Sequence, residues 1–102
     1  MYQRLSNNYT KKYYLNMLES TRQIILNILN QEKIPLWNSI LSQIEDIQHI
    51  INNNIIRDWE DVYERYSLGT IAVKCFSDND EMQLRLMDIF FGIVHFNELS
   101  NE

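Results

Sequence analysis

The sequence lacks the features of a disulfide-bonded or membrane-spanning chain. Its one cysteine, Cys75, cannot form an internal disulfide. No N-terminal stretch combines a basic start, an apolar run and a small-residue cleavage site. The longest apolar runs, such as residues 89–91, are far shorter than the roughly 20 residues that cross a bilayer. We therefore expect a cytoplasmic protein with no membrane span.

Groups suited to catalysis or metal binding are also scarce. Neither His49 nor His95 has Cys, Asp or Glu at the spacing of a closed zinc site. Asp88 precedes His95 by about 10 Å of helix axis, too far for direct proton transfer. Cys75 lacks a neighbouring base, so we expect a buried structural thiol. The sequence therefore predicts no enzyme activity, no metal and no cofactor, with His95 an ordinary, partly exposed histidine.

Size and composition favour one folded unit. A chain of 102 residues has room for a single domain, which we assign to 1–102, and can bury about two thirds of its extended surface without disulfides. Its 45% hydrophobic and 23% charged residues are near the average for soluble globular domains, which disfavours intrinsic disorder.

Apolar residues recur at helical spacing through most of the chain. Residues 10–31 are predicted as a helix capped by Thr10, and residues 35–51 as a second helix with Pro35 in its first turn. A short amphipathic helix follows the asparagines at 52–54 and ends near Ser67. The pattern predicts an all-α fold, a compact bundle of about four helices.

The segment after Gly69 is harder to interpret. Residues 70–76 are rich in β-branched side chains, but a lone strand has no partner, so we expect a loop or a short helical turn. Ser77 and Asp78 begin a helix-start pattern for a final helix over about 79–97. That helix is apolar around most of its circumference, except for a narrow polar stripe formed by Arg85, Asp88, Gly92 and His95.

The third predicted helix has two distinct faces. Trp59, Val62, Tyr63 and Tyr66 share one apolar arc, which we expect to pack on the core. The acidic side chains of the same helix lie on the arc facing water, and three further acids open the final helix. These seven candidate partner-binding residues are Asp58, Glu60, Asp61, Glu64, Asp78, Asp80 and Glu81. A solvated helix face and helix capping are the alternative explanations for them.

The acidity is concentrated after residue 33. Residues 1–33 hold five basic and two acidic side chains, a balance of plus three, while the rest holds four basic and twelve acidic ones, a balance of minus eight; the two sum to the net charge of −5. A pI near 4.9 has the wrong sign for binding phosphates, so direct nucleic-acid binding is not expected. A basic protein is the better electrostatic match.

Three short motifs lie in the last two thirds of the chain. They are Leu36 and Trp37 at the opening of a helix, the turn at 66–70, and the helix start at 76–80. With these motifs the chain resembles small bacterial immunity proteins encoded beside polymorphic toxins, including those of contact-dependent growth inhibition systems. The resemblance implies a non-enzymatic protein that binds one toxin domain, often a nuclease, and blocks it.

Two functions therefore stay open at the level of sequence. The first is an immunity protein that masks the active-site region of a cognate basic toxin, most often a nuclease. The alternative is an acidic helical regulator or adaptor of phage or plasmid origin that inhibits a nucleic-acid-binding protein. Both are cytoplasmic binding proteins that use the acidic surface.

Overall fold

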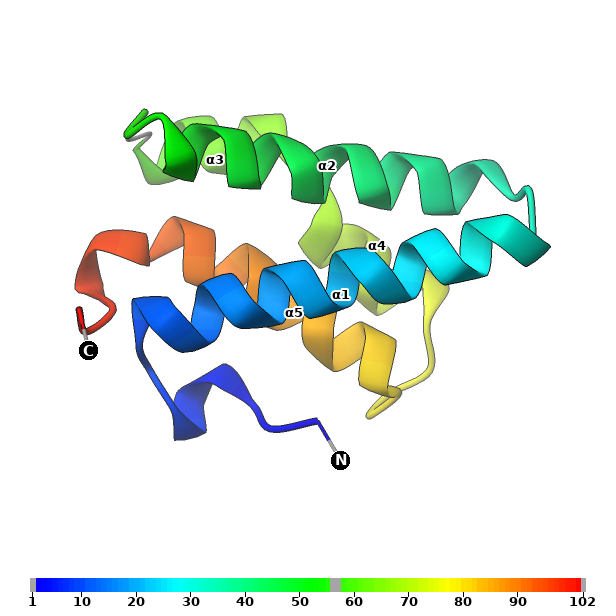
Figure 1. Cartoon of the computed structure of the whole chain (residues 1–102), viewed down its shortest axis with the longest axis horizontal. Helices are drawn as coiled ribbons and strands as arrows, with labels where there is room; N and C mark the ends of the chain where they lie inside the picture. Colours follow the sequence, from blue (N-terminus) through cyan, green and yellow to red (C-terminus); the bar gives the residue numbers. More distant parts are fainter. Residues whose placement is uncertain (1, 56–57, 102) are drawn as a thin grey trace.

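The computed structural model describes residues 2–55 and 58–101 (Figure 1). Its α-helices are α1 (Lys11–Gln31), α2 (Pro35–Asn52), α3 (Trp59–Arg65), α4 (Leu68–Cys75) and α5 (Glu81–Val94), with short 3-10 helices η1 (Leu5–Asn7) and η2 (Phe96–Glu98). No strand forms in the described part, where a single bridge pairs Thr10 with Ser100. The predicted all-α bundle is confirmed; four residues of the predicted 1–102 domain lie outside the described ranges.

The first two helices begin at residues that favour a helix start. The hydroxyl of Thr10 accepts a hydrogen bond from the backbone N–H of Tyr13, which caps α1. Pro35 occupies the first turn of α2, where its missing N–H costs nothing. The two helices lie side by side and run in opposite directions (Figure 1).

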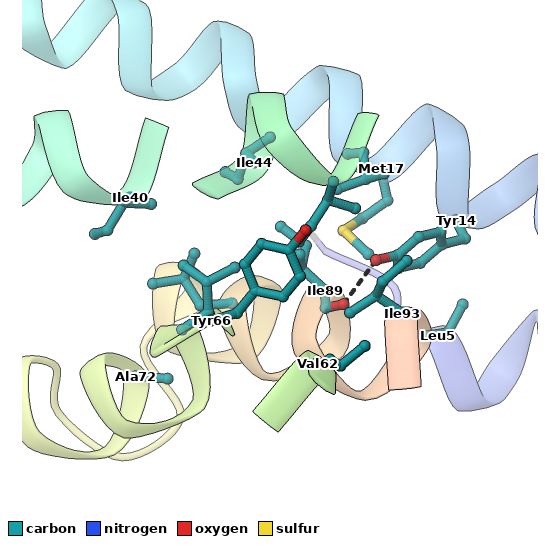
Figure 2. Packing of buried hydrophobic residues seen from close by; sticks show 14 of the residues in the cluster. Leu5, Tyr14, Met17, Ile40, Ile44, Val62, Tyr66, Ala72, Ile89 and Ile93 are labelled. Atoms are coloured by element: carbon teal, nitrogen blue, oxygen red, sulfur yellow. Dashed lines mark hydrogen bonds between the residues drawn. The ribbon is translucent and has the colours of Figure 1, made fainter. Parts of the chain in front are cut away.

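One cluster of buried side chains joins all the helices. Figure 2 shows Tyr14 and Met17 of α1 facing Ile44 of α2 and Ile89 of α5. The phenol of Tyr14 is fully buried and donates a hydrogen bond to the carbonyl oxygen of Ile89, at 2.7 Å. The radius of gyration is 13.0 Å, as expected for a compact chain of this length.

Residues 70–75 belong to the eight-residue helix α4 and Phe76 is its extended C-cap, so the expected loop or short helical turn was too limited a prediction. Leu68 and Ala72 lie four positions apart on α4 and are both completely buried, and α4 packs along α5. Burial of this apolar stripe stabilises the helix despite its β-branched residues, because tertiary packing overrides weak intrinsic propensity.

The last helix is shorter than predicted at both ends. Asn79 has a φ of 67°, a left-handed conformation that cannot continue into a right-handed helix. Asp80 is therefore the N-cap, and its carboxylate accepts from the N–H of Met82, whereas Ser77 and Asp78 precede the helix. The helix ends at Val94, and the chain continues into η2.

The predicted polar stripe of α5 is largely covered by the N-terminal segment. Asp88 is only 5% exposed; its carboxylate pairs with the guanidinium of Arg4 at 2.9 Å and accepts from the Tyr2 hydroxyl and the Leu5 N–H. The hydrogen bond to Asp88 raises the pKa of Arg4, and burial together with that carboxylate raises the pKa of Tyr2. Asp88 thus fastens residues 2–5 to α5 and does not face water.

Candidate functional site

Two large rings on α3 are exposed, which contradicts the expectation that its apolar arc is buried. Trp59 is 58% exposed and Tyr63 is 57% exposed, whereas Val62 and Tyr66 from the same arc are buried. The reason is geometric: a helix of seven residues lying on α5 has a narrow line of contact, so Val62 is covered, whereas Tyr63 reaches α5 through the Phe90 ring and stays more than half exposed.

The exposed rings form a connected row with α5. The centroids of Trp59 and Tyr63 are 5.9 Å apart, those of Tyr63 and Phe90 are 5.0 Å apart, and both pairs meet edge to face. This arrangement is the favourable one for aromatic quadrupoles and holds Tyr63 in place. We call Trp59, Glu60, Tyr63 and Glu64, together with Phe90 beneath them, the α3 surface.

Tyr63 separates two hollows in this surface. The first has a volume of about 380 Å³ and is lined by Tyr63, Tyr66, Gly69, Thr70, Val73, Lys74 and Phe90. The second has a volume of about 550 Å³ and is lined by Trp59, Tyr63, Val94, His95 and Glu98. Because exposed apolar groups bordered by polar ones mark interaction sites, the two hollows make α3 the leading candidate for a binding surface.

The acidic side chains of α3 differ in their position relative to the rings. At about 100° per residue, Glu60 and Glu64 lie within about 100° of Tyr63, whereas Asp61 lies about 160° from it. Asp58 is the N-cap, and its carboxylate accepts from the Asp61 N–H at 2.8 Å. Glu60 and Glu64 are thus the carboxylates that border the rings, and both are exposed.

The cation of α3 is directed away from this surface. Arg65 donates two hydrogen bonds to Asp46 of α2, at 2.7 and 3.1 Å, and the hydroxyl of Tyr66 donates to the same carboxylate. The Asp46 carboxylate raises the pKa of Arg65, while burial, followed by the hydrogen bond to Asp46, raises the pKa of Tyr66 to about 12. The pairing turns the Arg65 cation toward α2, so within α3 the charges beside the rings are those of Glu60 and Glu64.

The structure does not bring the two predicted acidic groups together. Asp78 is exposed before α5, Asp80 caps that helix, and Glu81 pairs with Arg85 at 3.0 Å. Nine residues, or about 13 Å of helix axis, separate Glu81 from Phe90, which contacts Tyr63. Figure 1 shows α3 at the upper left of the bundle and the start of α5 at the bottom, right of centre, so the seven acids do not form one surface.

The remaining candidate residues show no catalytic arrangement. His95 stacks against Phe91, with ring centroids 4.4 Å apart, and its Nδ1 pairs with the carboxylate of Glu98. Cys75 is exposed in the last turn of α4, which corrects the expected buried thiol; the buried stripe of that helix runs through Leu68 and Ala72 instead. His49 shares a hydrogen bond with the side chain of Asn53.

Residues 2–55 and 58–101 hold neither a cluster of metal-ligating side chains nor a helix suited to crossing a membrane. No three or more His, Cys, Asp or Glu side chains are placed together as metal ligands within them. None of their helices combines the length and the apolar character needed to cross a membrane. Comparison of the chain with protein-family models, curated proteins and solved structures also finds no match.

Proposed function

We propose that this chain is a non-enzymatic, cytoplasmic immunity protein that binds a cognate basic toxin domain through the α3 surface and blocks its activity. The observation that carries the proposal is the exposed ring pair of Trp59 and Tyr63, bordered by the carboxylates of Glu60 and Glu64. An exposed aromatic pair of this kind is unfavourable in water and gains stabilisation when a partner covers it.

The two kinds of side chain serve different steps of binding. Tryptophan and tyrosine are enriched among the residues that contribute most to protein interfaces, because they bury a large area at little cost in side-chain entropy. Carboxylates around such anchors accelerate encounter with a basic partner and disfavour acidic ones. Tyr63 is already held against Phe90, so it loses little freedom on binding.

A nuclease domain is the toxin class that fits this charge best. Enzymes that cleave nucleic acids bind phosphates through lysine and arginine, so their substrate-binding regions are basic. An acidic protein with a net charge of −5 that covers such a region competes with the substrate and adds electrostatic attraction. The proposal is therefore that the α3 surface masks the active-site region of a basic nuclease.

The position of the acids disfavours the alternative function. A regulator that imitates the charge of a nucleic acid needs carboxylates spaced along one continuous surface. Here the acids of α3 and those at the start of α5 lie at opposite ends of α5, and Glu81 is paired with Arg85. An aromatic anchor with two bordering acids is better suited to a specific protein partner.

Co-purification tests this proposal. The product of the gene immediately upstream would be co-expressed with this chain, isolated as a complex, and assayed for cleavage of plasmid DNA and tRNA after the complex is separated and remixed. We expect one equivalent of this chain to abolish cleavage and to protect growing cells from the upstream product. If the upstream product neither binds this chain nor is inhibited by it, the proposed function is wrong.

A further inference from the structure

The two hollows beside Tyr63 differ in charge. Among the lining residues that the structure describes, the smaller one includes the ammonium-bearing Lys74 and no carboxylate. Among its described lining residues, the larger one includes the carboxylate of Glu98, with His95 paired to it, and neither lysine nor arginine. Tyr63 borders both hollows, and a cation is disfavoured in the hollow beside Lys74 and favoured in the one beside Glu98.

The larger hollow combines the two groups that recognise a cation. The rings of Trp59 and Tyr63 both line it, nearly perpendicular to each other at 85°, and the face of an aromatic ring is electron-rich and attracts cations. Glu98 lies on η2, and its side chain is 66% exposed. A carboxylate has two oxygens with several acceptor positions, so the pairing of Glu98 with His95 leaves room for another donor.

We propose that this hollow, lined by Trp59, Tyr63 and Glu98, receives an arginine side chain of the basic protein partner. The planar guanidinium stacks on an aromatic face and still directs N–H donors toward a carboxylate in its plane, which the ammonium of lysine cannot do. This inference rests on the proposed function for the identity of the partner, and it adds the group on the partner that the surface recognises.

This hollow, called the slot from here on, also explains why the rings stay exposed without the partner. Trp59 is 58% exposed although it contacts Tyr63, so one of its faces is available to a ligand. Trp37, by contrast, is partly buried and packs against Phe76 at 5.7 Å, away from the hollow. The chain has only these two tryptophans, so each serves as the control for the other.

An NMR titration tests the slot without the toxin. Two capped tripeptides, Gly-Arg-Gly and Gly-citrulline-Gly, would be titrated into the 15N-labelled chain; citrulline keeps the shape of arginine but has no charge. We expect the arginine peptide to move the indole N–H signal of Trp59 in a saturable manner. The signal of Trp37 should stay in place, and the citrulline peptide should have little effect.

Charge variants make the test specific. The substitution Glu98→Gln should weaken binding of the arginine peptide by about two- to five-fold, as expected for one exposed charge contact. Glu32→Gln removes an exposed carboxylate at the end of α1 and should leave binding unchanged. Equal shifts with both peptides, equal movement of both indoles, or no shift at all would overturn the proposal.

The outcomes also separate this inference from the proposed function. If the arginine peptide does not bind but the upstream product is neutralised, the slot is wrong and the immunity function stands. If the arginine peptide binds at Trp59 but the upstream product is not neutralised, the slot is supported and the immunity function is wrong.

Discussion

The ring of Tyr14 occupies the space into which a side chain at Gly92 would project. A Cβ atom on Gly92 would lie 2.3 Å from Cε1 and 2.5 Å from Cδ1 of Tyr14, well inside contact distance. The same phenol is anchored by its hydrogen bond to the carbonyl of Ile89, so it cannot move aside easily. Glycine at position 92 lets α1 approach α5 closely.

This relationship predicts an unusual sign for Gly92→Ala. In an open helix interior, glycine-to-alanine substitution stabilises by about 1 kcal/mol, but here the added methyl group should destabilise by about 1–3 kcal/mol through overpacking. Gly69→Ala is the control, because its Cβ would lie 3.2 Å from Cδ2 of Phe90, a side chain that is only partly buried. Urea unfolding gives the free energy of unfolding of both variants. A Gly92→Ala protein that is more stable than the wild type would contradict the packing described.

The Asp88 cluster predicts a second stability effect. Asp88→Asn weakens the pairing with Arg4 and the hydrogen bonds from Tyr2 and Leu5, so the free energy of unfolding should fall by about 1–3 kcal/mol. Glu81→Gln is the matched control, since it removes an exposed ion pair with Arg85 and should change stability by about 0.5 kcal/mol or less. Equal effects of the two changes in thermal unfolding would show that Asp88 does not fasten the N-terminal segment.

Alkaline pH should destabilise the fold through Tyr66. Its folded pKa of about 12 lies above the value of 10.0 for a free phenol, so the folded state holds the proton more tightly than the unfolded state. The resulting stabilisation is complete below pH 10 and is lost as the pH rises from 10 to 12. Burial raises the pKa of Tyr14 and Tyr2 as well, so they act in the same direction.

The measurement is unfolding at a series of pH values for the wild-type chain and for Tyr66→Phe. The variant should be less stable at pH 7, because Asp46 loses a hydrogen bond, but it should lose less stability between pH 10 and 12. If the free energy of unfolding fell equally steeply with pH in the two proteins between pH 10 and 12, the pKa of Tyr66 would not be raised.

The exposed ring of Trp59 predicts that its removal weakens toxin binding much more than it lowers the stability of the fold. Trp59→Ala should lower the free energy of unfolding by about 1 kcal/mol or less, because more than half of the side chain is in water. Its effect on toxin affinity should be large, as expected for an aromatic anchor. Trp37→Ala provides the opposite case, a loss of stability through its packing on Phe76 with affinity retained. Retained affinity in Trp59→Ala would place the anchor elsewhere.

The sequence predicted the helices whose apolar pattern and end signals agree. Thr10 and Pro35 mark the starts of α1 and α2, and the apolar spacing that follows each is regular. The residues around 70–76 were misjudged because their β-branched composition opposes a helix that only contact with α5 stabilises.

The candidate site was only partly predictable, for a physical reason. Residue spacing places Trp59, Val62 and Tyr63 on one arc, but it does not reveal how much of that arc a neighbouring helix covers. The sequence signal for their exposure is the shortness of the helix, because an element of seven residues has little room to bury two large rings. The nearness of Glu98 to Trp59 depends on how α3 docks on α5, which local sequence does not encode.

The central claim is that a basic toxin docks on the α3 surface. Its most direct test is the affinity of the upstream product for two double charge reversals, Glu60→Lys with Glu64→Lys, and Asp78→Lys with Glu81→Lys, which change the net charge equally. We expect the first pair to weaken binding by about tenfold or more and to reduce its salt dependence, with a melting temperature close to that of the wild type. The second pair should bind almost as tightly as the wild type. Equal affinities for the two double variants would contradict the claim.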